Sequence, residues 1–254
     1  MAAPLGQVIG LARSVFVYRA RPLKRWRLKR FYGRFVGPGD LAFDVGAHVG
    51  DRVGAFLALG ARVVAVEPLP PAMALLRRIY GRKPGVTLVG AALGTAPGEA
   101  ELLVSHGAPT VSTTDPAWAE RLRTLPGFRH VRWDARAAVR VTTMDALIAV
   151  HGVPGFAKID VEGSEPAVLR GLSRPLPALS FEYTPGGADA AIACVERLCA
   201  LGDYRFNASV GETLRFVFPS WQQAPALITW LEARAVGERA GDVYAVIPAL
   251  SRDP

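Results

Sequence analysis

Two apolar segments joined through a glycine-containing loop constrain the fold of this chain more than any other feature. Residues 41–45 and 62–66 are short apolar runs that suit buried parallel strands, with a helix expected between them. Gly46 and Gly50 allow the loop after the first strand to adopt conformations that residues with a Cβ disfavour, so a ligand can approach its backbone closely. Glu67 follows the second strand, where an acid can reach the ribose of a nucleoside cofactor.

The spacing of the glycines distinguishes between classes of nucleoside cofactor. Dinucleotide-binding loops carry the pattern G-x-G-x-x-G, whereas this loop is G-x-x-x-G from Gly46 to Gly50. Asp44 lies two residues before Gly46, where its charge would repel a pyrophosphate and attract a ligand with an ammonium and a sulfonium group. S-adenosylmethionine carries both groups, and we predict it as the cofactor. A nicotinamide cofactor and a glycine turn without a ligand are the alternatives.

Strand and helix patterns alternate along the chain. Further strands are expected at residues 86–89, 100–104, 139–141, 156–159, 178–181, 204–207 and 243–247. Helices are expected at residues 70–80, 117–125, 144–150, 165–172, 189–201 and 221–234. Such alternation requires a mostly parallel sheet with helices on both faces, so the predicted fold is an α/β, Rossmann-like three-layer sandwich.

Two of these helices begin at residues with capping properties. Thr142 and Asp145 resemble a capping box ahead of the helix at 144–150. Ser164 is placed to cap the helix at 165–172, and Glu165 in its first turn is expected to offset the helix dipole.

The excess positive charge of the chain is confined to its N-terminal segment. The formal net charge is +8, and nine of the 30 basic residues precede Asp40 with no acid among them. The remaining 21 basic residues nearly balance the 22 acids. We expect residues 1–38 to form a basic helical arm with an apolar face, and residues 39–254 to form the Rossmann-like domain.

Three roles are open for this basic arm. It could pack on the domain as a solvated helix, present a surface to an anionic substrate or a nucleic acid, or lie at a membrane interface. Its apolar residues are Val15, Phe16, Tyr18, Trp26, Leu28, Phe31 and Tyr32. Packing on the domain is the simplest of the three roles.

Length and cysteine content indicate a chain that folds without disulfide bonds. With 254 residues, half of them hydrophobic, the chain can bury a full core. Cys194 and Cys199 lie five residues apart in an expected helix and point in different directions, which favours neither a disulfide nor a metal site. No apolar run reaches about 18 residues, and no signal-peptide pattern is present. A soluble, cytoplasmic protein is therefore expected.

A second group of acids follows the strand at 156–159. Asp160 and Glu162 come directly after this strand. Because the carboxyl ends of parallel strands lie at one edge of a sheet, these two acids should lie near Asp44 and Glu67. Four carboxylates are thus predicted to converge on one rim, where Glu182 adds a further acid after the next strand.

Methyl transfer to oxygen requires an in-line approach and a group that removes or shares the hydroxyl proton. Asp160 is the first candidate for this role and Glu162 the second. We predict no metal, with a divalent cation shared by Asp160, Glu162 and Glu182 as the alternative. The polar loop at 105–115 is a candidate substrate lid, and small residues around Ala92 leave room for an adenine ring.

Four segments, in this order and spacing, resemble the FkbM family of methyltransferases. They are Asp44-Val-Gly-Ala-His-Val-Gly50, Val66-Glu-Pro68, Val141-Thr-Thr-Met-Asp145 and Lys158-Ile-Asp-Val-Glu-Gly-Ser-Glu165. Many methyltransferases share the first motif, whereas the last is distinctive of the family. The resemblance extends from about residue 39 to residue 173, more loosely to residue 183, and does not include the basic arm.

The resemblance implies a class I S-adenosylmethionine-dependent enzyme with a mostly parallel seven-stranded sheet, acting as an O-methyltransferase on natural products or sugars. It implies that Asp160 lies beside the methyl group and that Glu162 shapes the acceptor site. The predicted cofactor-binding residues are Asp44, Gly46, Ala47, His48, Gly50, Glu67, Pro68, Ala92 and Asp160.

Other functions stay open as alternatives. A nucleic-acid methyltransferase or RNA-binding protein could use the basic arm, although the chain lacks the N/D-P-P-Y-type loop expected for methylation of base amino groups. A catalytically silent interaction protein and a nicotinamide-dependent oxidoreductase are the others. The expected partner is a small-molecule or glycan acceptor; nucleic acid is not expected, and the arm could make peripheral membrane contact.

Overall fold

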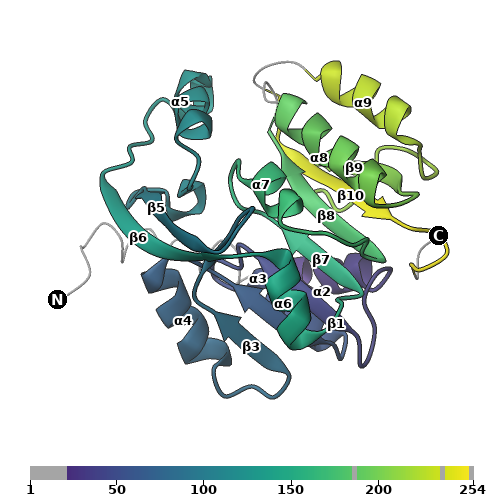
Figure 1. Ribbon diagram of the computed structural model, residues 1–254, viewed down its shortest axis with the longest axis horizontal. Coiled ribbons are helices and arrows are strands. Elements are labelled where there is room, and N and C mark those ends of the chain that lie inside the picture. Colours follow the sequence, from purple (N-terminus) through teal and green to yellow (C-terminus); the bar gives the residue numbers. More distant parts are fainter. Residues whose placement is uncertain (1–21, 185–187, 235–237, 252–254) are drawn as a thin grey trace.

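The computed structural model describes residues 22–184, 188–234 and 238–251, and within them seven strands form one sheet in the order β3-β2-β1-β7-β8-β10-β9 (Figure 1). The strands are β1 (Leu41–Val45), β2 (Arg62–Val66), β3 (Val86–Val89), β7 (Phe156–Ile159), β8 (Ala178–Tyr183), β9 (Arg205–Val210) and β10 (Gly241–Val246). All neighbouring pairs from β3 to β8 are parallel, whereas β10 runs antiparallel to both β8 and β9. The predicted mostly parallel seven-stranded sheet is confirmed.

Helices cover both faces of this sheet (Figure 1). They are α2 (Pro22–Tyr32), α3 (Asp51–Ala58), α4 (Pro70–Tyr80), α6 (Met144–His151), α7 (Glu165–Arg170), α8 (Ala188–Leu201) and α9 (Ala224–Glu232). A further helix, α5 (Pro116–Thr124), packs in a separate apolar cluster with Val111 and Val131. Phe43 and Val45 of β1 pack in the core with α6, α7, α8 and α9, whereas Ala42 packs in the core with α2, α3 and α4. Successive residues of a strand point to opposite faces, so the sheet is buried on both sides and the three-layer prediction is confirmed.

A second, smaller sheet lies outside the three layers. It contains β4 (Ala92–Leu93), β5 (Gly98–Val104) and β6 (Ala135–Thr142), in the order β4-β6-β5. The strands expected at 100–104 and 139–141 are therefore longer than predicted and pair with each other rather than joining the main sheet. Exposed residues alternate with partly or fully buried residues along much of β6, which is typical of an antiparallel strand with one solvated face.

The described part of the basic arm packs on the domain. Leu28, Phe31 and Tyr32 of α2 are buried in the same core as α3, and Phe35 follows them into it. Trp26, predicted on the apolar face, is instead 56% exposed, and the guanidinium carbon of Arg30 lies 5.5 Å from its ring centroid. Residues 1–21 of the predicted arm, with Val15, Phe16 and Tyr18, lie outside the described residues.

Both predicted helix caps need correction. The N-cap of α6 is Thr143, whose hydroxyl accepts a hydrogen bond from the Ala146 N–H, and not Thr142. The Ser164 hydroxyl does not cap α7; it is hydrogen-bonded to the Thr114 hydroxyl at 2.8 Å. The Thr114 partner of Ser164 is 50 residues away in the sequence, so local sequence does not specify it.

None of the helices in the described ranges has the length and apolar character that crossing a bilayer requires. Cys194 is buried, Cys199 is exposed, and both are free thiols, as their spacing predicts.

Candidate active site

A cavity of about 300 Å³ lies at the carboxyl ends of the parallel strands. From the residues predicted to bind cofactor or catalyse, its wall includes Gly46, Ala47, His48, Glu67, Pro68, Ala92, Asp160 and Glu162. Glu182, the further acid expected on this rim, also lines the cavity. The sheet thus brings together side chains that are more than a hundred residues apart in the sequence, because every strand concerned ends at the same edge.

Two of the predicted residues do not line the cavity. Asp44 is 1% exposed and lies within β1, where burial raises its pKa to about 6. Its Oδ2 atom is buried and makes no hydrogen bond within the described residues. Gly50 is in the left-handed region, with φ 78°, and its carbonyl accepts a hydrogen bond from the Tyr80 hydroxyl at 2.7 Å. Asp44 thus lies in the strand before the glycine loop, and Gly50 ends that loop.

The glycine loop turns back onto the end of β2. The backbone N–H groups of Gly46 and Ala47 both donate to the Val66 carbonyl, at 2.9 and 3.0 Å. Gly46 has φ 81° and His48 has φ 45°, so the chain enters the left-handed region twice within three residues. This turn places the loop backbone against the cavity directly beside Glu67.

Glu67 is held in a defined orientation by two backbone donors. Its Oε2 accepts from the His48 N–H and its Oε1 from the Leu69 N–H, each at 2.8 Å. Burial raises the pKa of Glu67 to about 7 despite these two bonds, because the charged carboxylate is poorly solvated at 6% exposure. Each carboxylate oxygen has a further lone pair, so the ionised group can still accept hydrogen bonds from two ligand hydroxyls.

His48 contributes mainly through its backbone. Burial lowers the pKa of its imidazole to about 4, so the ring is neutral near pH 7. Its N–H orients Glu67, and its side chain lines the cavity. The other three histidines of the sequence, His106, His130 and His151, are not among the residues that line the cavity.

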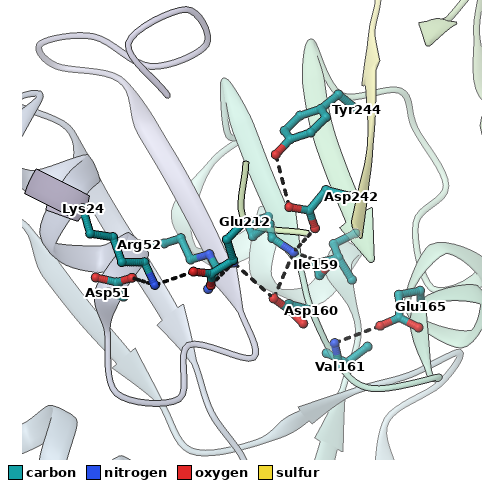
Figure 2. Close-up of polar contacts among 11 residues, drawn as sticks. Lys24, Asp51, Arg52, Ile159, Asp160, Val161, Glu165, Glu212, Asp242 and Tyr244 are labelled. Carbon is teal, nitrogen blue, oxygen red and sulfur yellow. Dashed lines mark hydrogen bonds and ion pairs between the residues drawn. The ribbon is translucent and has the colours of Figure 1, made fainter. Parts of the chain in front are cut away.

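A buried lysine organises the other side of the cavity. Lys158 is 0% exposed, and its Nζ lies 3.0 Å from Asp160 Oδ2 and 2.9 Å from Asp242 Oδ1. Burial lowers the pKa of an isolated lysine, but the two carboxylates outweigh this effect and raise the pKa of Lys158. Figure 2 shows Asp160 and Asp242 together, with the Tyr244 hydroxyl donating to Asp242 Oδ2 at 3.2 Å.

Neither Lys158 nor Asp242 was assigned a role from the sequence. A signal for Lys158 was present, because a lysine inside an otherwise apolar, buried strand requires a partner. No such signal was present for Asp242. Asp242 is far from the other site residues in the sequence, and only the pairing of β10 with β8 brings it opposite Glu182.

Three carboxylates meet where β7 and β8 end. Oxygen atoms of Asp160, Glu162 and Glu182 lie within 4.8 Å of one another. Burial by itself would raise the pKa of Asp160, but the positive charges of Lys158 and Arg52 lower it. Burial and the neighbouring negative charges raise the pKa of both Glu162 and Glu182. The site therefore holds one carboxylate kept ionised by cations and two that retain protons more readily.

The loop that carries Glu162 is held by hydrogen bonds and close packing. Both oxygens of Glu165 accept backbone N–H bonds, from Val161 at 2.9 Å and from Gly163 at 3.0 Å (Figure 2 shows the first). Glu165 therefore orders this loop, which goes beyond the expected compensation of the helix dipole. Glu162 itself has φ 56°, and its carbonyl accepts a 2.6 Å hydrogen bond from the Thr113 hydroxyl.

The segment expected as a substrate lid lies over this loop. Thr113 pairs with Leu103 of β5 through backbone hydrogen bonds of 2.8 and 3.0 Å. Trp118 of α5 packs so closely on Gly163 that a Cβ at Gly163 would lie 2.3 Å from its ring. Thr110, Ser112 and Thr114 line the cavity. The segment thus forms a wall of the cavity, fixed to the Glu162 loop.

A model of the FkbM methyltransferase domain matches residues 44–206. The chain belongs to the FkbM methyltransferase family. The prediction from the four sequence motifs is confirmed, the nicotinamide-dependent oxidoreductase is excluded, and the methyl donor is S-adenosylmethionine.

Solved structures similar to this methyltransferase include other methyltransferases. An O-methyltransferase from Bacillus cereus, in complex with SAH, has 12% identity and a TM-score of 0.48, over 97% of this chain and 92% of that chain. A precorrin-6y C5,15-methyltransferase from Geobacter metallireducens has 14% identity and a TM-score of 0.41, over 87% and 88%. A comparison with curated proteins found no match. Identities this low assign no acceptor to the FkbM protein.

The residues of the cavity fit the charges and shape of S-adenosylmethionine. Glu67 offers acceptor oxygens for ribose hydroxyls, and Ala91 and Ala92 leave space beside it for a flat base. Asp160 lines the cavity and its carboxylate is kept ionised, and Asp44, which does not line the cavity, holds a buried carboxylate oxygen without a hydrogen-bond partner among the described residues. Negative charge on this side of the cavity suits a ligand that carries sulfonium and ammonium groups.

Proposed function

We propose that this methyltransferase acts on a hydroxyl oxygen of a small-molecule or glycan acceptor. S-adenosylmethionine, when bound, supplies a methyl group made electrophilic by its sulfonium sulfur. The protein has to hold the donor, align the acceptor oxygen with the methyl group, and accept the hydroxyl proton.

Positions along the sheet edge divide the cavity into a donor end and an acceptor end. Glu67 follows β2, Gly46 follows β1, Asp160 follows β7 and Glu182 lies in β8, in that spatial order. Neighbouring strands are about 5 Å apart, so roughly 10 Å separate the β2 and β7 positions. This span supports an extended donor whose ribose is held at Glu67 and whose reactive centre lies near Asp160.

The environments of the carboxylates support different roles for Asp160 and Glu162. Asp160 is paired with Lys158, and the resulting low pKa makes it a weak proton acceptor. Such a permanent negative charge is suited to lie near the positive sulfonium. Burial and the neighbouring carboxylates raise the pKa of Glu162, so its carboxylate is a stronger proton acceptor than that of Asp160. We therefore assign the proton-accepting role to Glu162 first, reversing the order predicted from the sequence.

The wall of the acceptor end has a mixed polar and apolar character. Thr110, Ser112 and Thr114 provide hydroxyl groups, and Leu102 and Pro109 provide apolar surface. Hydroxyl groups of this kind can donate to and accept from a polyhydroxylated acceptor. The single observation that carries the proposal is the meeting of Asp160, Glu162 and Glu182 at this end, which supports a proton acceptor there.

Methyl transfer from labelled S-adenosylmethionine to a panel of hydroxylated metabolites and sugars tests the proposal. We expect product with acceptors that have a free hydroxyl and none with their O-methylated counterparts. Glu162→Gln should lower kcat by about 10²- to 10⁴-fold, the usual contribution of a general base, while S-adenosylhomocysteine binding stays within a few-fold of wild type.

Glu196→Gln on α8 is a matched control, because Glu196 is exposed and lies outside the cavity. It should leave kcat unchanged. Methyl transfer to nitrogen or carbon atoms only, or a full kcat in the Glu162 variant, would refute the proposal.

A further inference from the structure

Positive charge is scarce in the wall of the cavity. Among the described residues that line it, Arg52 is the single lysine or arginine. Seven lining residues are acids: Asp51, Glu67, Asp160, Glu162, Glu182, Glu212 and Asp242. A ligand with a carboxylate would therefore meet one cation in a largely negative cavity, so the position of Arg52 decides where such a group can bind.

Arg52 is the second residue of α3, immediately after the glycine loop. Its Nη2 lies 3.7 Å from Asp160 Oδ2 and 3.9 Å from Glu212 Oε1. These are ion-pair distances, too long for hydrogen bonds. The Nε atom is buried and makes no hydrogen bond within the described ranges. The guanidinium thus lines the cavity beside the buried Tyr32 hydroxyl, and the two carboxylates of its ion pairs lie beyond hydrogen-bond distance.

Closer cations hold the two acids that form ion pairs with Arg52. Lys24 of α2 places its Nζ 2.7 Å from Glu212 Oε2 and 3.1 Å from Asp51 Oδ2. Lys158 holds Asp160 at 3.0 Å. Figure 2 shows Lys24, Arg52 and Glu212 grouped beside Asp160. Because Asp160 and Glu212 have these nearer cations, Arg52 can bind a ligand carboxylate and both acids still keep an ion-pair partner.

We propose that Arg52 binds the α-carboxylate at the amino acid end of S-adenosylmethionine. The inference depends on the donor of the family and not on the proposed hydroxyl acceptor. With the ribose at Glu67 and the sulfonium near Asp160, the amino acid end is directed at the loop between β1 and α3, where Arg52 follows Gly50. Arginine matches a carboxylate with two parallel N–H donors, so this contact would fix both the position and the orientation of the methionine group.

An acidic acceptor is the other possible source of a carboxylate for Arg52, and a ligand series distinguishes the two. The ligands are S-adenosylhomocysteine and decarboxylated S-adenosylhomocysteine, which differ only in the group that Arg52 is proposed to bind. Isothermal titration calorimetry gives both dissociation constants for wild type, Arg52→Gln and Arg52→Lys. Arg62→Gln is the matched control, because Arg62 is an exposed arginine on β2 outside the cavity.

In wild type and Arg62→Gln we expect S-adenosylhomocysteine to bind about 10- to 100-fold more tightly than its decarboxylated form. This ratio corresponds to the free energy that one charge-assisted hydrogen bond contributes to binding. Arg52→Gln should reduce this preference to less than about three-fold by weakening only the carboxylate-bearing ligand. Arg52→Lys should keep part of the preference, because it retains the charge, and it also serves if Arg52→Gln does not fold.

Three results would overturn the proposal: an unchanged preference in Arg52→Gln, an equal loss of affinity for both ligands, or normal S-adenosylhomocysteine binding with a raised KM for acidic acceptors only. If wild type binds neither ligand, both the Arg52 proposal and the assignment of S-adenosylmethionine as methyl donor are refuted. Normal binding with no methylation of hydroxyls would refute the proposed function alone.

Discussion

Gly46 and Asp160 lie in direct backbone contact at the centre of the site. A Cβ on Gly46 would lie 1.7 Å from the Asp160 carbonyl oxygen, closer than any real contact allows. The two residues come from the ends of neighbouring strands, β1 and β7, paired in parallel. A glycine at position 46 is therefore required for β7 to bring Asp160 beside the glycine loop, as well as for the positive φ of the turn.

Gly46→Ala should separate these two loops. The clash is with backbone and cannot be relieved by moving a side chain, and the left-handed φ adds about 1 kcal/mol of strain. We expect S-adenosylhomocysteine affinity to fall at least about tenfold, with a loss of about 1 to 3 kcal/mol in the free energy of unfolding. Calorimetry and urea denaturation measure both. Gly98→Ala, where a Cβ meets open space, should change neither the affinity nor the stability appreciably.

Cofactor affinity should depend on the ionisation of Glu67. Burial raises the pKa of Glu67 to about 7, and the ionised form is the better acceptor for ribose hydroxyls. Affinity should therefore rise with pH, by about tenfold between pH 6 and pH 8, and level off above that. Glu67→Gln should bind more weakly and show a flatter profile. Identical pH profiles for the two proteins, measured by calorimetry, would contradict this role.

The stability of the unliganded protein should change with pH in the opposite direction. The folded-state pKa of Glu67 is about 7, above the ordinary 4.5, so the folded protein retains the proton that the unfolded chain releases. Its stabilising contribution is complete below about pH 4.5 and is lost as the pH rises through 7. The free energy of unfolding of wild type should therefore decrease more steeply between pH 5 and pH 7 than that of Glu67→Gln, as urea titrations would show.

Phe35 should contribute much more to stability than Trp26, although both belong to the basic N-terminal segment. The Phe35 ring stacks on Phe156 and Tyr244, with centroid distances of 4.9 and 5.7 Å, and is 2% exposed. Phe35→Ala should cost about 3 to 5 kcal/mol of unfolding free energy, whereas Trp26→Ala should cost less than about 1 kcal/mol. Equal costs in chemical denaturation would mean that this segment is not part of the core.

Glu165→Ala should loosen the loop that carries Glu162. Two backbone N–H groups, of Val161 and Gly163, would lose their acceptor, at a cost of about 1 to 3 kcal/mol in unfolding free energy. We expect kcat to fall while S-adenosylhomocysteine affinity changes less than about three-fold, because Glu165 acts through the position of Glu162. Glu196→Ala is the exposed control. A reduced cofactor affinity with normal kcat would show that Glu165 orders a different part of the site.

Most of the fold and the donor end of the site could be predicted from the sequence. The glycine loop, Asp44 and Glu67 lie within one strand-loop-helix-strand unit, and their positions follow from local patterns and the topology of parallel sheets. Asp160 and Glu162 were placed at the same edge by the same rule. The predicted cap of α6 was wrong by one residue, because Thr143 and not Thr142 caps it, and the predicted capping role of Ser164 was wrong because its hydroxyl bonds Thr114, 50 residues away.

The sequence by itself determined which strands are buried, where the chain turns at glycine, and which edge of the sheet carries the acids. These features depend on the periodicity of side chains and on backbone conformations that few residues allow. Only the tertiary structure decided that Lys158 keeps Asp160 ionised and that Asp242 forms a second ion pair with Lys158. It also decided that Arg52 is the one lysine or arginine among the described residues that line the cavity. The reason is that charge interactions depend on burial and on distances through space. Lys24 of α2 and Asp242 of β10 take part in these ion pairs although they come from opposite ends of the chain.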